Sequence, residues 1–334
     1  MNGCDEMGRE AIAHNETLAS TASFLLPRQR ILPLRFKTVR SMLRLMALAM
    51  LGALLPMASP AIAQDEAAPA ADAPSAEKAK LDKERAKRLE QMTAAADDYQ
   101  LGRGRDDDEP LVRVERPVLR WSNPLRAAAD GAVFLWADAK GERRPAAAMC
   151  IYGNGEDGED HEWQSLATGP LRAAYRGAAV WRPQSAGLEF RAVPGAAAAT
   201  PARRLAQMHA LLRDFSATAG RETGQHELRL LTHPIYRYGD GESELIDGAV
   251  FAFAQATDPE ILLLLEARRE SDVRKESEAG QANAKPAAWR WAAARMSMVP
   301  LDLKHRDAVV WSVDWHYGND ERQPRVTFTR KRAG

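Results

Sequence analysis

Hydrophobic positions recur at helical spacing in two segments of the chain and at strand spacing in much of the rest. Between Glu77 and Tyr99, the apolar residues Leu81, Leu89 and Met92 lie among Lys, Arg and Glu, which predicts an amphipathic helix. A second helical pattern covers Ala202 to Phe215. Short apolar or alternating runs bounded by turn residues follow each helix, and such runs are typical of β-strands.

Six strands are predicted after each helix. Short turn-rich connections separate most of them, which favours antiparallel neighbours, because parallel strands need a long crossover. The run from Ile261 to Leu265 is apolar at every position, so both of its faces should be covered. The predicted strands are Val112–Arg120, Ala132–Ala137, Ala146–Tyr152, His161–Leu166, Ala178–Trp181, Leu188–Val193, His226–Leu231, Ala249–Gln255, Ile261–Arg268, Trp289–Met298, Asp302–Trp311 and Arg325–Thr329.

The two halves of the chain resemble each other in sequence. The segment Ala86–Ala94 matches Ala202–Ala210, and Asp130-Gly131-Ala132-Val133-Phe134 recurs as Asp247-Gly248-Ala249-Val250-Phe251. Leu119-Arg120 followed by Pro124 is aligned with Leu228-Arg229 followed by Pro234. We therefore predict an α+β fold, a tandem duplication of a helix-plus-curved-antiparallel-sheet unit, with repeat 1 at 76–194 and repeat 2 at 200–330. By element order each unit is analogous to a cystatin-like or NTF2-like roll. The two copies could be separate domains or could join their sheets into one structure, and the apolar run at Ile261–Leu265 favours the second.

The N-terminal region carries the pattern of an export signal. Arg44, an apolar run from Leu45 to Leu55 and the small-residue triplet Ala61-Ile62-Ala63 predict a signal peptide over 42–63, cleaved at Ala63-Gln64. We expect 1–41 to be an untranslated or non-native extension and 64–75 to be a flexible linker. The apolar run is shorter than the roughly 20 residues a bilayer span needs, so no stable membrane insertion is expected after cleavage. A periplasmic or secreted location follows.

The balance of charge changes the expected partners. Residues 1–63 hold seven of the 46 basic and four of the 46 acidic side chains, so the remainder carries 39 basic and 42 acidic groups. Nucleic-acid-binding proteins usually present a basic patch or stripe, and no such excess is present here. No nucleic-acid partner is predicted.

His161-Glu162-Trp163 is the most suggestive local cluster for chemistry. The zinc-protease pattern H-E-x-x-H would need a histidine at Ser165, so that motif is absent. The acidic loop at 156–160 has oxygen ligands suited to calcium but lacks the alternation of an EF-hand, so a solvated turn is favoured and no metal site is assigned. Cys150 lies within an apolar run and is interpreted as a buried core residue, although a base at His161 would make it a candidate nucleophile.

A second group of candidates lies on one predicted strand. His233, Tyr236 and Tyr238 are ligand-contact candidates, together with His161, Glu162 and Trp163. His233 precedes a proline, which favours extended backbone, and it is aligned with Asn123 in the first half. Asp130 and Asp247, each followed by glycine, are interpreted as turn residues.

Several of these segments resemble a family of exported, uncharacterised bacterial proteins that carries no known activity. They are Leu119-Arg120-Trp121-Ser122-Asn123-Pro124, His161–Arg172, and Asp247–Phe251 followed by Thr257-Asp258-Pro259-Glu260. The resemblance implies export and the predicted fold only. The leading hypothesis is a non-enzymatic protein that binds an unidentified ligand or envelope protein through a sheet face or the inter-repeat groove, without a cofactor. The alternatives are a hydrolase-like enzyme using His161 or Cys150, and a structural envelope component.

Overall fold

We analysed a computed structural model, which describes residues 73–104, 109–123, 130–154, 158–221, 224–239, 241–269 and 287–331. The expected extension, signal peptide and most of the expected linker lie outside these residues. Within them no helix is long and apolar enough to cross a membrane. The first helix, α1 (Ala73–Asp97), begins a few residues before the predicted helical segment and ends two residues before its predicted end at Tyr99, which starts a strand.

The expected α+β fold class is wrong, because the described chain is mostly β-strand with only two helices. Its strands form two curled sheets rather than a tandem pair of helix-plus-sheet rolls. The first sheet contains β1 (Tyr99–Arg103), β2 (Glu109–Arg113), β3 (Leu119–Trp121), β4 (Gly131–Asp138), β5 (Pro145–Asn154), β6 (Gly158–Ser165), β7 (Leu171–Tyr175), β8 (Ala178–Trp181) and β17 (Arg325–Lys331). The second contains β9 (Arg191–Ala196), β10 (Phe215–Ala219), β11 (His226–Tyr238), β12 (Leu245–Gln255), β13 (Asp258–Arg268), β14 (Ala288–Arg295), β15 (Leu301–His305) and β16 (Ala308–Val313).

Each sheet includes one strand from the other half of the sequence. The first sheet runs β8-β7-β1-β2-β4-β5-β6-β17, with β3 paired beside β4, and the second runs β16-β15-β10-β11-β12-β13-β14-β9. All the pairs are antiparallel, as the short connections predict. β9, from the first half, therefore ends the second sheet, and β17, the last strand of the chain, ends the first. Neither half of the sequence is a self-contained unit.

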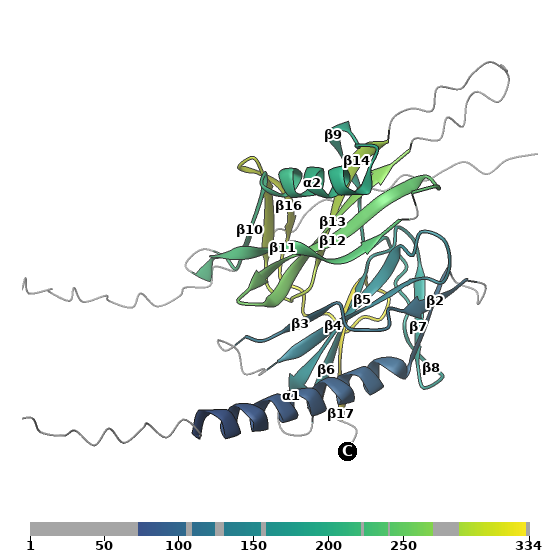
Figure 1. Cartoon of the computed structure of the whole chain (residues 1–334). Coiled ribbons are helices and arrows are strands. Elements are labelled where there is room, and N and C mark those ends of the chain that lie inside the picture. The colour runs from purple at the N-terminus through teal and green to yellow at the C-terminus, as the bar shows by residue number, and fades with distance from the viewer. Residues whose placement is uncertain are drawn as a thin grey trace, which may run out of the picture. The chain divides into compact units, whose positions relative to one another are not determined.

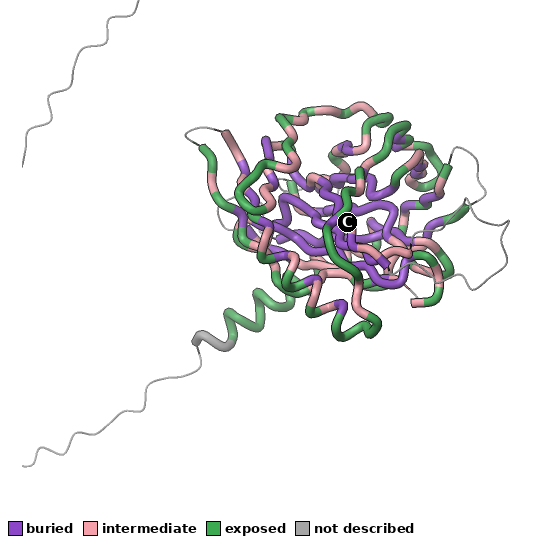
Figure 2. The backbone as a smooth tube through the Cα atoms, turned by 90° about the horizontal axis from the view of Figure 1, so that it is seen from above, coloured by how far each residue is buried: buried purple, intermediate pink, exposed green. Residues whose placement is uncertain are grey.

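The two sheets and two helices form four layers, in the order α1, first sheet, second sheet, α2 (Pro201–Leu212) (Figure 1). Met92 and Ala96 of α1 pack on the first sheet, and Met208 and Leu212 of α2 pack on the second. A third apolar cluster fills the space between the sheets. Figure 2 shows the buried positions gathered in the strands, while the early turns of α1 are exposed.

The apolar run on β13 is covered on both faces, as its pattern predicts. Ile261, Leu263 and Leu265 pack in the cluster under α2, whereas Leu262 and Leu264 pack in the cluster between the sheets. Successive strand side chains point to opposite faces, so a strand between two apolar layers must be apolar at every position.

Asp247, interpreted from the sequence as a turn residue, is instead a buried ion-pair partner. Its carboxylate accepts hydrogen bonds from Arg204 of α2, at 2.7 Å, and from Arg237 of β11, at 2.7 and 3.0 Å. Arg204 is itself buried, with 6% of its side chain exposed. One carboxylate therefore joins the helix to two adjacent strands of the second sheet.

Asp130 occupies the corresponding place in the first sheet, and the turn interpretation is wrong there too. It accepts hydrogen bonds from Arg88 of α1 and Arg120 of β3, both at 2.6 Å. These two guanidinium groups are more accessible than Arg204, with 32% and 25% of their side chains exposed. Both helices are thus fixed to their sheets by an aspartate between two arginines.

The strand register corrects one part of the sequence alignment. Arg120 lies opposite Ala132 and Arg237 lies opposite Ala249, at the same position of the repeated Asp-Gly-Ala-Val-Phe segment. Arg120 therefore corresponds to Arg237 and not to Arg229. The long strand β11, which contains a bulge, follows the path that β2 and β3 take as two separate strands.

Candidate functional site

The cluster His161-Glu162-Trp163 lies on β6 and is divided between the two faces of the first sheet. His161 and Trp163 point towards α1, where the Tyr99 hydroxyl lies 2.8 Å from His161 Nδ1. The other ring nitrogen of His161 lies 3.6 Å from the carboxylate of Glu159. His161 is almost completely buried, and burial raises the pKa of Tyr99. This arrangement positions a core histidine and does not open to solvent.

Glu162 points the other way, towards the second sheet. Its Oε1 accepts hydrogen bonds from the Tyr152 hydroxyl at 3.0 Å and from Arg325 of β17 at 2.9 Å. Burial raises the pKa of Glu162, although the positive charge of Arg325 opposes the shift. This ion pair joins β6 to β17, the strand that the second half of the chain contributes to the first sheet.

Cys150 and His161 do not converge. Cys150 belongs to the cluster between the sheets, whereas His161 faces α1. The thiol accepts a hydrogen bond from the Trp121 indole at 3.1 Å, and burial raises the pKa of Cys150 well above its ordinary value. A nucleophile is activated by a neighbouring base or a lowered pKa, whereas the pKa of Cys150 is raised and the proposed base His161 lies on the other face of the sheet.

The candidates on β11 separate at its bulge. His233 is exposed there, and its predicted equivalence with the buried Asn123 does not hold in the strand register. Tyr236 and Tyr238 lie on one face, with nearly parallel rings whose centroids are 5.9 Å apart. The Tyr236 hydroxyl donates to the carbonyl of Arg143, and the Tyr238 hydroxyl donates to Glu266 at 3.0 Å.

Glu266, the partner of Tyr238, lies beside an arginine-lined pocket where the two halves of the chain meet. The cavity has a volume of about 710 Å³. We call it the arginine pocket. The first half contributes Arg144, from the connection between β4 and β5, and Phe190 and Ala192 near β9. The second half contributes Glu244, Arg268, Arg269, Ala288, Trp289 and Arg290, and Thr168 completes the lining.

Glu266 holds two of these arginines in place. Its side chain is fully buried and accepts from Arg144 Nε at 2.8 Å and from Arg290 Nε at 2.8 Å. Both guanidinium groups also lie against the ring of Phe190, with their central carbons 5.1 and 4.2 Å from the ring centroid. Burial disfavours the charged form of Arg144, but the interactions with Glu266, Tyr238 and Asp138 together outweigh it and raise the pKa. Arg144 is therefore charged at all physiological pH values.

The remaining donors of the pocket are only partly used within the protein. Arg268 pairs with Glu244, and Arg269 donates to the carbonyls of residues 241–243. Nη2 of Arg144 is buried and has no hydrogen-bond partner in the described part of the chain. Buried polar atoms nearly always have partners, so this donor marks a position where an acceptor would fit.

No local sequence pattern marks this pocket, because its arginines come from three separate segments. Only Tyr238, among the predicted ligand-contact residues, lies next to it. The one clue is the single acidic residue Glu266 directly after five apolar positions, because a buried carboxylate requires cationic partners. The position of Glu266 in the sequence does not identify the arginines that pair with it.

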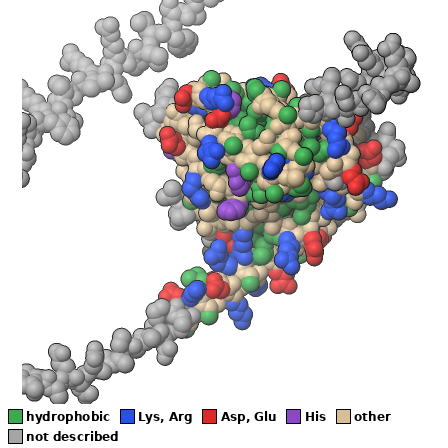
Figure 3. All heavy atoms as spheres, turned by 45° about the horizontal axis from the view of Figure 1, so that its top comes forward, with side chains coloured by type: hydrophobic (Ala, Val, Ile, Leu, Met, Phe, Trp, Pro, Cys, Tyr) green, Lys and Arg blue, Asp and Glu red, His purple; other side chains and the backbone are tan. Residues whose placement is uncertain are grey.

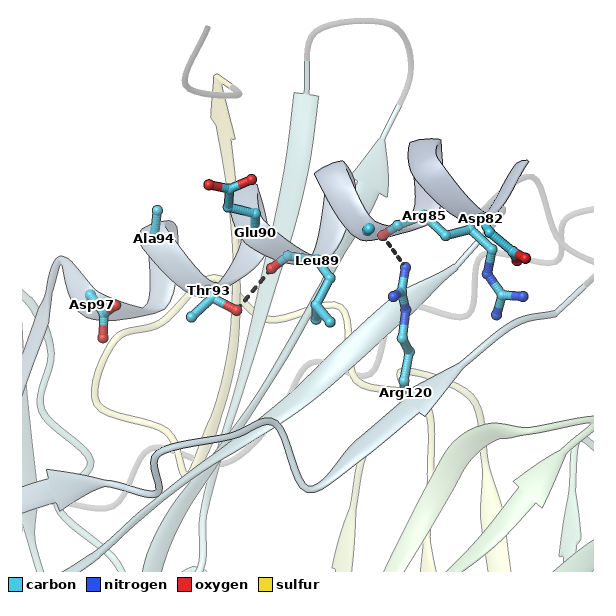
Figure 4. Close-up of a pocket in the computed structure, with 9 residues that line it drawn as sticks. Asp82, Arg85, Leu89, Glu90, Thr93, Ala94, Asp97 and Arg120 are labelled. Atoms are coloured by element: carbon cyan, nitrogen blue, oxygen red, sulfur yellow. Dashed lines mark hydrogen bonds between the residues drawn. The ribbon is translucent and has the colours of Figure 1, made fainter. Parts of the chain in front are cut away.

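A second cavity of about 650 Å³ runs along α1 and is less suited to a ligand. Figure 4 shows two hydrogen bonds within its lining: Thr93 donates to the Leu89 carbonyl, and Arg120 donates to the carbonyl of Arg85. Nη2 of Arg120 also pairs with Asp130, whereas its Nε is buried without a hydrogen-bond partner in the described part of the chain. On the face drawn in Figure 3, basic and acidic side chains are interspersed.

No metal-ligating group of three or more His, Cys, Asp or Glu side chains occurs in the residues that the structure describes. Glu156 and Asp157 of the acidic loop lie outside those residues. Comparison with family models, curated proteins and solved structures gives no match to this chain.

Proposed function

We propose that this protein is an exported, non-enzymatic binding protein that takes a small anionic ligand into the arginine pocket. The observation that carries the proposal is the buried Nη2 of Arg144, which lacks a partner in the described chain and lines a cavity with three more arginines. Glu244 is the only acidic side chain among the lining residues, so the lining is basic even with Glu266 counted beside it.

The chemistry of the lining narrows the ligand to a class. A guanidinium group presents several donors in a fixed plane that matches carboxylate, phosphate or sulfate oxygens. Trp289, Phe190 and two alanines supply apolar surface beside these donors. We expect an anion attached to a compact apolar body, and such a ligand suits a site formed where the two halves of the chain meet.

Thermal unfolding with added anions tests this proposal. Inorganic phosphate, sulfate and benzoate are the probes, and chloride at matched ionic strength is the control. A ligand that binds only the folded state stabilises it by about 2.7 kcal/mol at a concentration 100 times its Kd. At least one probe is expected to raise Tm beyond the chloride control, and benzoate does so if the apolar surface contributes.

A pair of matched variants locates the effect. Arg268→Gln removes a partly exposed pocket arginine whose partner is Glu244, and Arg322→Gln removes an exposed arginine paired with Asp320 outside the pocket. Loss of one charged hydrogen bond costs about 1.5 kcal/mol, or about tenfold in affinity. We expect that loss for Arg268→Gln alone. Equal affinities in the two variants, or no binding of any probe by the wild-type protein, would refute the proposal.

A further inference from the structure

The outer edge of β17 has backbone groups without partners. β17 is the last strand of the first sheet and pairs only with β6. Ser165 donates its backbone N–H to the carbonyl of Pro324, which makes these two residues a hydrogen-bonded pair. Because such pairs alternate along an antiparallel ladder, Val326, Phe328 and Arg330 bond to β6. The intervening residues direct their backbone groups away from it.

The contact of His316 supports this direction. Its Nε2 lies 3.0 Å from the carbonyl of Arg325, which is the first of the outward-facing groups. Further along the strand, Thr327 and Thr329 make no backbone hydrogen bond at this edge within the described chain. The start of β17 is held firmly, because residues 321 and 322 accept backbone hydrogen bonds from Arg182 and Gln184 beyond β8. An exposed edge of this kind is a template for another strand.

A cavity of about 480 Å³ lies along this edge. Met298 and residues 316–319 form one wall, and residues 325 and 327–330 form the other. The hydroxyl of Thr327 is buried there without a hydrogen-bond partner among the described residues, whereas the Arg330 guanidinium lies on the opposite face of the strand, against the ring of Tyr175. The backbone edge therefore lies in a preformed groove that also offers one side-chain donor.

Large apolar side chains are exposed at the rim of the groove. Tyr317 and Trp315 are 71% and 50% exposed, and their rings stack with an interplanar angle of 6° and centroids 5.4 Å apart. Met298 is exposed beside them. Extended peptides that add to a sheet edge gain affinity from main-chain hydrogen bonds and specificity from pockets for alternate side chains. This groove offers both.

The charge of the strand selects among possible occupants. Arg330 and Lys331 place positive charge at the end of β17, whereas Arg325 at its start is buried in an ion pair with Glu162. Opposite charges on neighbouring strands stabilise a strand pair, and like charges destabilise it. An acidic partner strand is therefore favoured. We infer that the β17 edge binds an extended peptide in which acidic side chains alternate with apolar ones.

Fluorescence anisotropy with a labelled Glu-Val-Glu-Val-Glu-Val peptide tests the inference directly. The same peptide with N-methyl groups on alternate residues removes the N–H donors that strand addition needs, and a Lys-for-Glu version reverses the charge. The unmodified peptide is expected to bind about tenfold more tightly than either control. Absence of binding by the wild-type protein, or equal binding of the N-methylated peptide in both of its methylation frames, would overturn the inference.

Two variants place the binding on the outer edge. Thr329→Pro removes a backbone N–H that points away from β6, where proline is tolerated on an edge strand, and Thr329→Val keeps that N–H. Thr329→Pro should weaken peptide binding about tenfold and Thr329→Val should retain it. If Thr329→Pro fails to fold by circular dichroism, the peptide controls on the wild-type protein decide. Binding of a chitin oligosaccharide lost in Tyr317→Ala, with no peptide binding, would instead assign the groove to a sugar and overturn the inference.

Discussion

Replacing Asp247 by Asn should destabilise the protein more than replacing Asp130 by Asn. Each carboxylate lies between two arginines and joins a helix to its sheet, so the two substitutions remove the same kind of contact. The two substitutions differ in how far the remaining arginines are buried. Arg204 remains buried after the charge of Asp247 is lost, whereas Arg88 and Arg120 can turn their guanidinium groups towards water.

The exposures set the expected size of each effect. Removing one partner of a buried ion pair costs about 3–5 kcal/mol, because the other charge stays desolvated. We expect about that loss for Asp247→Asn. Asp130→Asn should cost about 1–2 kcal/mol, between the values typical of exposed and buried pairs.

Urea denaturation followed by tryptophan fluorescence measures both free energies of unfolding. Asp320→Asn is the control, since Asp320 pairs with Arg322 at the surface and its loss should leave the denaturation midpoint unchanged. Equal losses for the two buried aspartates, or a larger loss at Asp130, would show that exposure of the arginines does not govern the cost.

Three more predictions concern the core. Gly248→Ala would place a methyl group 2.3 Å from the ring of Tyr238 and should cost about 1–3 kcal/mol in a denaturation experiment, whereas Gly169→Ala meets no neighbouring atom and should have no effect. Cys150 should react with a thiol reagent far more slowly in the native protein than in urea, and rapid native reaction would contradict its burial. The folded-state pKa of Glu162 is raised above its unfolded value, so its contribution to stability is full below the unfolded pKa and is lost as pH rises through the folded pKa. Glu162→Gln should therefore gain stability relative to wild type as pH rises above the unfolded pKa of a glutamate, about 4.3, and a relative loss on that rise would contradict the sign of the shift.

Local structure was largely predictable from the sequence where one pattern governed it. The helix at α1 and the buried strand β13 follow from apolar spacing alone. The pattern over Asp302–Trp311 was less informative, because one predicted strand is in fact the hairpin β15–β16. Its turn has positive φ angles at Arg306 and Asp307, a backbone state that a hydropathy pattern does not reveal.

The fold class and the candidate site depend on contacts between distant segments. The duplicated helices suggested two self-contained units, but the pairing of β17 with β6 and of β9 with β14 depends on long-range register. Glu162 and Trp163 are neighbours in sequence, yet strand alternation sends them to opposite faces of the sheet. The arginine pocket combines residues separated by more than a hundred positions, so no local pattern could have assembled it.

Because β9 and β17 each lie in the sheet formed mostly by the other half of the chain, the order of synthesis affects how the sheets are completed. The first sheet lacks its end strand until residues 325–331 have been synthesised, although most of its other strands are complete much earlier. Before then, β6 presents an unpaired edge, and Glu162 lacks the buried cation that compensates its charge. Domains commonly fold as units during synthesis, with the N-terminal one first. Here a strand from the second half closes the first sheet, so both halves reach their final form together.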